Sequence, residues 1–132
     1  MTTPRRGDLL NAACPTRDVL DRIGSKWVSM LVKLLEPADE VRFAALRRGA
    51  SGISSKMLAE TLRTLERDGF VVRRVEPCVP PAVHYRLTDL GRSLAVPLAA
   101  LRGWAEEHMP AVDDARAVYD ADRAAQEANA PA

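Results

Sequence analysis

The sequence predicts a mainly α-helical chain with a small β-hairpin wing, the α+β class of winged helix-turn-helix domains with helices added at both ends. Three observations predict this class: two helices joined by a glycine-containing turn, a hairpin directly after them, and strongly apolar helices on either side. At 132 residues and 47% hydrophobic content, the chain can bury one core. We expect a flexible arm over residues 1–13, one domain over 14–110 and an acidic, alanine-rich, partly disordered tail over 111–132.

The first predicted helical region carries a continuous apolar face. This face consists of Val19, Leu20, Ile23, Trp27, Met30, Leu31 and Leu34. Gly24 interrupts it, and Ser25 is suited to cap a new helix, so Gly24 is expected to be a joint between two helices.

The helix-turn-helix is predicted to end at Gly69. Phe43 and Leu46 form the apolar side of a short helix, which the turn over residues 49–52 ends. Ser54 can cap a second helix, and Gly69 can adopt the left-handed conformation that ends it. The buried stripe of this second helix is Leu58, Leu62 and Leu65.

A β-hairpin is predicted directly after Gly69. Residues 70–75 are mostly β-branched or aromatic, residues 83–87 alternate apolar with polar, and residues 77–82 hold three prolines. A hairpin in this place is the wing of a winged helix. It can lie along the sugar-phosphate backbone or enter a minor groove while the preceding helix enters the major groove.

The last predicted helix begins after Thr88, a good N-cap. Its apolar positions are Leu90, Leu94, Leu98, Leu101 and Ala105. Pro97 lies inside the helix and predicts a bend. This apolar stripe is longer than one winged-helix core can cover, so we expect part of it to pack against a second copy of the chain. The alternative is a helix that folds back onto the core of its own chain. We expect about two more helical turns after Val112 and disorder from Gln126 onward.

Charge is distributed unevenly along the chain. The formal net charge is only +1, yet residues 42–74 hold eight basic side chains against three acidic ones. From residue 105 to the end, seven acidic residues face two basic ones. A solvated charged face is the simplest explanation, but beside a helix-turn-helix the basic stretch favours neutralisation of DNA phosphates.

Composition argues against several other classes. No apolar run is long enough to span a bilayer and no secretory signal is visible, so we expect a cytoplasmic protein without a membrane partner. Two cysteines and two histidines lack metal-ligand spacing, and no phosphate loop or nucleophile elbow occurs. We therefore expect no enzyme, metal or cofactor. A winged-helix module that binds another protein and no DNA remains an alternative.

Several spaced motifs carry a family resemblance. They include Cys14-Pro15, Ile23-Gly24-Ser25-Lys26-Trp27, Arg42-Phe43, Leu46-Arg47-Arg48, Gly52-Ile53-Ser54, Lys56-Met57-Leu58, Leu62, Leu65-Glu66, Asp68-Gly69, Val79-Pro80-Pro81, Tyr85, Leu87-Thr88 and Leu90-Gly91. In this order they resemble the HxlR-type winged-helix transcriptional regulators over about residues 14–109. The resemblance implies a bacterial or archaeal regulator that binds a palindromic operator in duplex DNA as a homodimer, pairing through its first and last helices.

These patterns nominate two sets of residues. The candidate DNA-binding residues are Arg47, Arg48, Ser54, Ser55, Lys56, Glu60, Arg63, Thr64, Arg73, Arg74 and His84. The candidate dimer interface comprises Val19, Leu20, Ile23, Trp27, Leu94, Leu98, Leu101 and Trp104. Residues common in the family are replaced at three places, by Ala59-Glu60, Ala82 and His84. The operator sequence and the contact of the wing with DNA can therefore differ from those of the family.

Cys14 is the candidate redox-sensing residue. It lies close to a helix start with Arg17 one turn on, so the helix dipole and a cation could both favour its thiolate. The resemblance implies a thiol switch at this place in some members, operated by a small oxidant or electrophile. A small buried side chain without a role is the alternative. A rival signal is a small aromatic or electrophilic inducer bound in a cavity. Cys78, at the wing tip, has no helix end to activate it.

Overall fold

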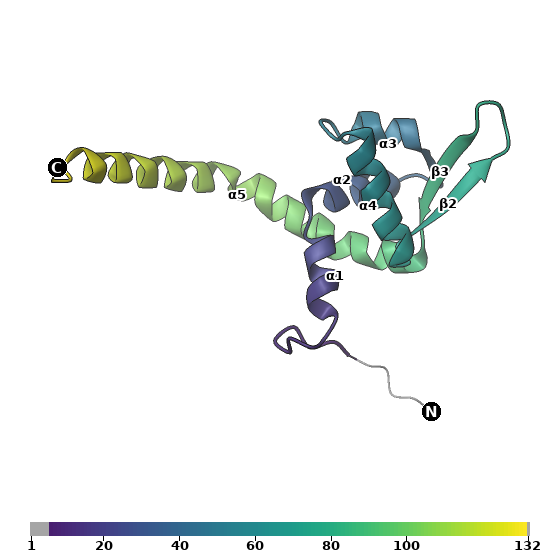
Figure 1. The fold of residues 1–132 in the computed structure, drawn as a ribbon, viewed down its shortest axis with the longest axis horizontal. Helices are drawn as coiled ribbons and strands as arrows, with labels where there is room; N and C mark the ends of the chain where they lie inside the picture. Colours follow the sequence, from purple (N-terminus) through teal and green to yellow (C-terminus); the bar gives the residue numbers. More distant parts are fainter. Residues whose placement is uncertain (1–5, 132) are drawn as a thin grey trace. The chain divides into compact units, whose positions relative to one another are not determined.

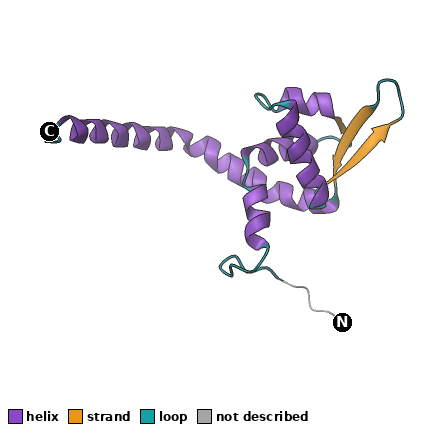
Figure 2. Cartoon of the chain, viewed as in Figure 1, coloured by secondary structure: helices purple, strands orange, loops and turns teal. Residues whose placement is uncertain are grey.

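A computed structural model describes residues 6–131, and the chain forms two compact units, one ending at Leu98 and one beginning at Ala99. The elements are α1 (Thr16–Ile23), α2 (Lys26–Leu35), β1 (Val41–Arg42), α3 (Phe43–Gly49), α4 (Ser55–Arg67), β2 (Val71–Glu76), β3 (Ala82–Leu87) and α5 (Asp89–Ala128). Figures 1 and 2 show the two-stranded wing beside α3 and α4. The predicted winged helix-turn-helix class is confirmed.

The helix-turn-helix forms through the local signals that predicted it. The Ser54 hydroxyl oxygen accepts a hydrogen bond from the backbone N–H of Met57 at 3.0 Å, which caps the start of α4. Gly52 in the turn and Gly69 after α4 have φ of 91° and 83°, a region that side chains with a Cβ rarely adopt. The joint at Gly24 is also confirmed, since Ser25 caps α2 by accepting from the N–H of Trp27 at 3.2 Å.

The sheet has one strand more than the predicted hairpin. It is antiparallel with the order β1-β3-β2, and β1 places Arg42 opposite His84. In the wing itself, Arg73 pairs with Tyr85, and Arg74 pairs with His84. Because neighbouring positions of a strand point to opposite faces, Arg73 shares the face of the buried Tyr85, whereas Arg74 and His84 share the other face.

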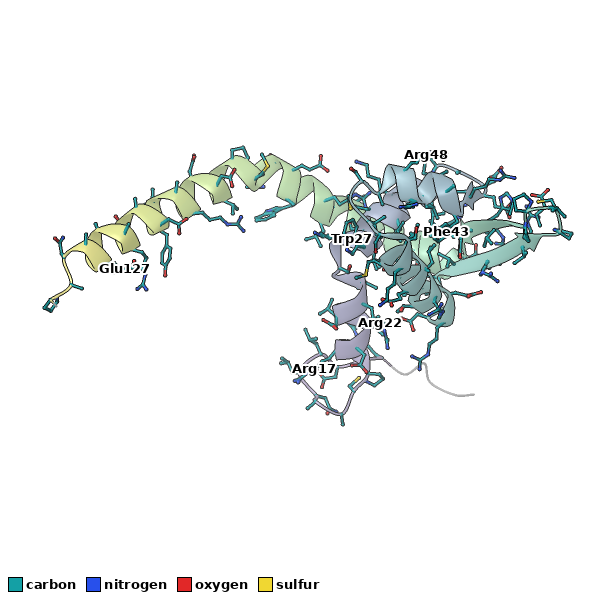
Figure 3. All side chains as sticks on the ribbon, turned by 45° about the horizontal axis from the view of Figure 1, so that its top comes forward. Arg17, Arg22, Trp27, Phe43, Arg48 and Glu127 are labelled. Atoms are coloured by element: carbon teal, nitrogen blue, oxygen red, sulfur yellow. The ribbon has the colours of Figure 1, made fainter. Side chains whose placement is uncertain are left out.

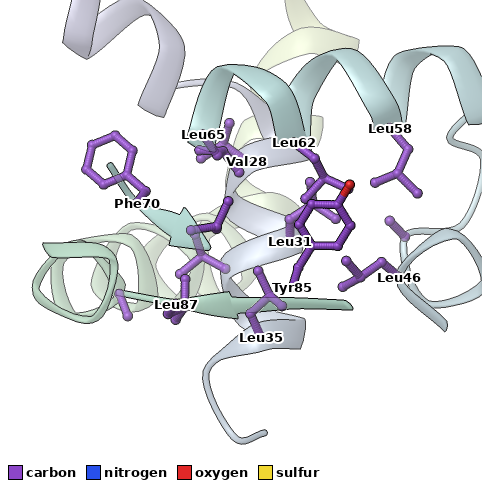
Figure 4. Packing of buried hydrophobic residues seen from close by; sticks show 14 of the residues in the cluster. Val28, Leu31, Leu35, Leu46, Leu58, Leu62, Leu65, Phe70, Tyr85 and Leu87 are labelled. Atoms are coloured by element: carbon purple, nitrogen blue, oxygen red, sulfur yellow. The ribbon is translucent and has the colours of Figure 1, made fainter. Parts of the chain in front are cut away.

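The hydrophobic core holds α4 by one side only. Leu58, Leu62 and Leu65 are buried and point toward α2 and the sheet, as Figure 4 shows. Leu31 of α2 and Tyr85 of β3 complete this packing. Burial of each leucine side chain contributes about 1.5–3 kcal/mol. On the opposite side of α4, Lys56, Glu60 and Arg63 are exposed.

The first turns of α5 pack onto the core of the same chain. The Thr88 hydroxyl oxygen caps the helix by accepting from the N–H of Gly91 at 3.1 Å. Gly91 lies so close to the chain at Phe70 that a Cβ would overlap its carbonyl oxygen. Ala95 and Leu98 are buried as well. The alternative prediction, a helix folded back onto its own core, therefore describes this part of α5.

The helix then runs further than the sequence suggested. It passes Pro97 and Pro110 without a break and continues to Ala128, where about two turns beyond Val112 had been expected. Alanine has the highest helix propensity of any residue, and the seven alanines from 111 to 128 favour the longer helix. The first part of the predicted flexible arm, residues 1–5, lies outside the described residues. From Asp8 to Cys14 the backbone forms hydrogen-bonded turns.

Candidate nucleic-acid interface

The outer side of α4 carries a stripe of charged side chains. Lys56, Glu60, Arg63 and Arg67 follow one another at spacings of four, three and four residues, so they share one side of the helix. All four are exposed. The three cations sit opposite the buried leucines, where a helix entering a DNA groove would present its reading side.

Arg63 lies in a groove between α4 and the wing. Ala59, Arg63 and Glu66 of α4 line this groove together with Arg73 and Tyr85 of the sheet. The structure thus brings two predicted DNA-binding arginines together, 10 positions apart in the sequence and on different elements. Between residues 6 and 131, neither arginine forms an ion pair within the chain, so both guanidinium groups can bind an external anion.

The helix ends around the turn add further donors and cations. Ser55 and Lys56 are exposed in the first turn of the 13-residue helix α4, where free N–H groups and the helix dipole favour an anion. Arg47 and Arg48 are exposed in the last turn of α3. Figure 3 shows Arg48 on the surface of α3. The hydroxyl oxygen of Ser54 already accepts the hydrogen bond that caps α4.

Thr64 is placed less favourably than the prediction assumed. It is half-buried, and its hydroxyl donates a hydrogen bond to the carbonyl oxygen of Glu60 at 3.1 Å. Asp68 follows it by four residues and forms an ion pair with Arg22 of α1 at 3.5 Å. Thr64 therefore lies on the side of α4 toward α1, away from the groove that holds Arg63.

Arg74 and His84 lie on the sheet face opposite Arg73 and already have acidic partners. The Arg74 guanidinium donates two hydrogen bonds to the Glu40 carboxylate, at 2.9 and 2.6 Å. This contact lowers the pKa of Glu40 and raises the pKa of Arg74. His84 Nε2 lies 2.9 Å from a carboxylate oxygen of Glu76. Because carboxylates engage both side chains, we do not expect Arg74 or His84 to contact DNA.

Cys14 sits in a small hollow before α1. Its Sγ accepts a hydrogen bond from the backbone N–H of Asp8 at 3.3 Å and lies 3.1 Å from the hydroxyl oxygen of Thr16. The Thr16 hydroxyl, followed by the N–H of Asp8, lowers the pKa of the Cys14 thiol. Arg17 is not among the groups that lower this pKa; its guanidinium donates to the carbonyl oxygens of Leu9 and Leu10 at 2.9 and 3.1 Å. Figure 3 labels Arg17 on α1.

Comparison with known proteins places this geometry in a family. The model of the HxlR-like helix-turn-helix family matches residues 22–113 of the chain. The chain belongs to the HxlR-like helix-turn-helix family. It is thus a transcriptional regulator of the helix-turn-helix type.

Relatives of this HxlR-like chain agree with that assignment. The uncharacterized HTH-type transcriptional regulator YtfH of Escherichia coli is 45% identical over 117 residues, which cover 86% of this chain and 91% of the relative. The solved structure of the transcriptional regulator YtfH from Salmonella typhimurium is 41% identical, with a TM-score of 0.79 over 84% of this chain and 98% of that one. The redox regulator HypR in its oxidized form is 39% identical, with a TM-score of 0.64 over 71% of this chain and 96% of that one.

The eight predicted dimer residues of the HxlR-like chain differ in exposure. Val19 and Leu20 on α1 are exposed, and so are Leu101 and Trp104 on α5. Ile23, Trp27 and Leu94 are half-buried against the core, and Leu98 is buried in it. The four exposed residues are the ones that retain apolar surface for a partner.

Three residues of the site were missed by sequence reasoning. Thr16 hydrogen-bonds the Cys14 sulfur, and Glu40 and Glu76 hold Arg74 and His84. Thr16 could have been found, because it follows Cys14 by two residues at a helix start. Glu40 could not, since it lies 34 residues from Arg74 and only the short strand β1 brings the two together.

Two other kinds of feature are absent from the described residues. Within them, no group of three or more His, Cys, Asp or Glu side chains is arranged to hold a metal ion. None of the helices between residues 6 and 131 combines the length and the hydrophobicity that crossing a bilayer requires.

Proposed function

We propose that this HxlR-like regulator binds a palindromic operator in duplex DNA as a homodimer, with α4 as the recognition helix. The observation that carries the proposal is the groove in which Arg63 of α4 and Arg73 of the wing lie together without acidic ion-pair partners. A DNA strand that follows this groove would meet a base-reading helix on one side and a basic strand on the other.

Seven side chains of the surface have assigned tasks in this proposal. Arg63 reads a guanine edge through two hydrogen bonds in the major groove, and Glu60 reads an adjacent base. Lys56 and Ser55 bind a phosphate at the start of α4. Arg73 binds the backbone beside the groove, while Arg47 and Arg48 hold a neighbouring phosphate.

Two copies are required for tight binding, because one helix and a few phosphate contacts bind DNA weakly. We propose that the copies pair through the exposed apolar side chains of α1, Val19 and Leu20, and of α5, Leu101 and Trp104. A two-fold pair then reads two half-sites about 34–36 Å apart, one turn of the DNA helix.

Cys14 is the proposed signal input. Its lowered pKa increases the reactive thiolate at neutral pH, and the hollow beside it gives a small oxidant or electrophile access to the sulfur. The relative HypR is named a redox regulator. The helix α1 connects Cys14 to α4, because α1 begins at Thr16 and its Arg22 pairs with Asp68 at the end of α4. Figure 3 labels Arg22 on α1.

The test is fluorescence anisotropy of the full chain on its own promoter region and on random duplex, over a salt series. Specific binding that falls linearly in log salt is expected. Absence of specific binding, or binding without salt dependence, would favour the module that binds another protein. The series is then repeated after diamide treatment, with Cys14→Ser as the matched control. A diamide effect that survives in Cys14→Ser would exclude Cys14 as the sensor and point to Cys78 or to a bound inducer.

A further inference from the structure

Glu60 places a carboxylate in the middle of the cationic stripe of α4. It follows Lys56 by four residues and precedes Arg63 by three, and its side chain is exposed. Both cations are within reach on a helix, yet among residues 6–131 the Glu60 carboxylate forms no ion pair. Its backbone carbonyl oxygen, and not its carboxylate, accepts from the hydroxyl of Thr64 at 3.1 Å. The carboxylate is therefore free on the side of α4 that is proposed to face DNA.

A free carboxylate at this place weakens binding to DNA unless a base compensates its charge. The DNA phosphates repel it, and entry of the helix into the major groove removes water from it. Removing water from an ionised group costs free energy unless a hydrogen-bond donor replaces that water. A carboxylate only accepts hydrogen bonds, so the compensating group on the DNA has to be a donor.

The major groove offers two kinds of donor, the N4 amino group of cytosine and the N6 amino group of adenine. Guanine and thymine present only hydrogen-bond acceptors there. The adenine amino group lies between two acceptors, its own N7 and the O4 of the paired thymine, and both would repel a carboxylate. The cytosine amino group has an acceptor on one side only, the O6 of the paired guanine. Cytosine is therefore the base that a carboxylate favours.

Between Lys56 and Arg63, a stretch that the structure describes in full, Glu60 is the only charged residue. The one other polar side chain, Thr61, donates its hydroxyl to a backbone carbonyl oxygen one turn earlier at 2.7 Å. The remaining residues of the stretch are apolar. Glu60 is thus the side chain that meets the base pair beside the one that Arg63 reads.

We infer that Glu60 selects a cytosine next to the guanine that Arg63 reads. The inference rests on the proposed entry of α4 into the major groove, and it names the base that the proposed function leaves open. Three residues advance a helix by about 4.5 Å, and base pairs follow one another at about 3.4 Å. Glu60 and Arg63 therefore reach neighbouring base pairs when α4 lies along the groove. Each operator half-site then contains two adjacent G·C pairs under α4.

The test is selection of binding sites by the full chain from a pool of duplexes of random sequence, followed by sequencing. Arg63→Ala identifies the pair that Arg63 reads, because the preference for guanine is lost there. At one of the two neighbouring pairs, the unaltered chain should favour cytosine over each other base at least about fivefold, a low value for one specific base contact. Glu60→Gln should change this preference to adenine, since an amide can accept from N6 and donate to N7. Glutamine and glutamate have nearly equal helix propensity, so α4 is retained.

Glu66→Gln is the matched control, because it removes the same charge from the same helix. Glu66 is exposed and lines the groove toward the end of α4. Its replacement should strengthen binding to all duplexes alike, by reducing repulsion of the phosphates, and should leave the base preferences as they are. If the unaltered chain selects guanine at the Arg63 pair but no cytosine beside it, the inference is overturned and the proposed function stands. The same holds if Glu60→Gln and Glu66→Gln select identical sequences. Selection of no sequence by the unaltered chain would overturn both.

Discussion

Replacing Arg63 by alanine should remove base discrimination without disturbing the fold. Among the described residues Arg63 has no ion-pair or hydrogen-bond partner in the chain and is exposed, so the unfolding free energy should stay nearly constant. A guanidinium that holds a guanine edge by two hydrogen bonds contributes about 1–3 kcal/mol of discrimination. For each half-site, the preference for operator over random duplex should therefore fall about 5- to 150-fold.

Lys56→Ala is the matched control, because Lys56 lies on the same stripe of α4 but at its phosphate-binding end. This variant should weaken operator and random duplex equally and reduce the slope of log affinity against log salt by about 0.9 per copy. Both variants are measured by anisotropy on the operator, on a duplex altered at single base pairs and on random duplex. If Arg63→Ala weakened all duplexes alike, with the reduced salt slope of Lys56→Ala, Arg63 would be a phosphate contact and the assignment as base reader would be refuted.

Two further predictions concern packing and the thiol. Gly91→Ala should cost about 1–3 kcal/mol of unfolding free energy, because its Cβ would overlap the Phe70 carbonyl oxygen. Gly103→Ala, where nothing lies within 4 Å, should cost nothing; equal denaturation midpoints for the two variants would contradict this packing. Thr16→Val should raise the pKa of Cys14 by removing the hydrogen bond that lowers it most. The thiolate is the reacting form, so the midpoint of the curve of Cys14 alkylation rate against pH should move to higher pH in Thr16→Val. An unchanged curve would rule out this role of Thr16.

The parts of the fold that sequence reasoning predicted correctly are those encoded within a few residues. Ser25 and Ser54 cap their helices through N–H groups two and three residues away, and Gly69 ends α4 through its own φ. The strand β1 was missed because two residues show no periodicity, and its partners in β3 lie 42 and 44 residues away in the sequence. The helix α5 extends beyond the two turns predicted after Val112 and past Gln126, where disorder was predicted, because the alanines of this exposed acidic segment favour helix.

In the candidate site, too, features encoded within a few residues could be predicted and features set by distant packing could not. The charged stripe of α4 follows from helical spacing alone, so Lys56 and Arg63 could be placed in advance. The sequence could not predict which arginine of the wing lies beside them. Arg73 and Arg74 are neighbours, and a shift of the strand register by one position exchanges the faces to which they point. The burial of Tyr85 fixes the register of β3, and the pairing with β2 then puts Arg73 beside Arg63 and leaves Arg74 to Glu40. The proposed DNA surface thus depends on the helical spacing of charged residues on α4, which is local, and on the strand register that selects Arg73 over Arg74, which tertiary packing determines.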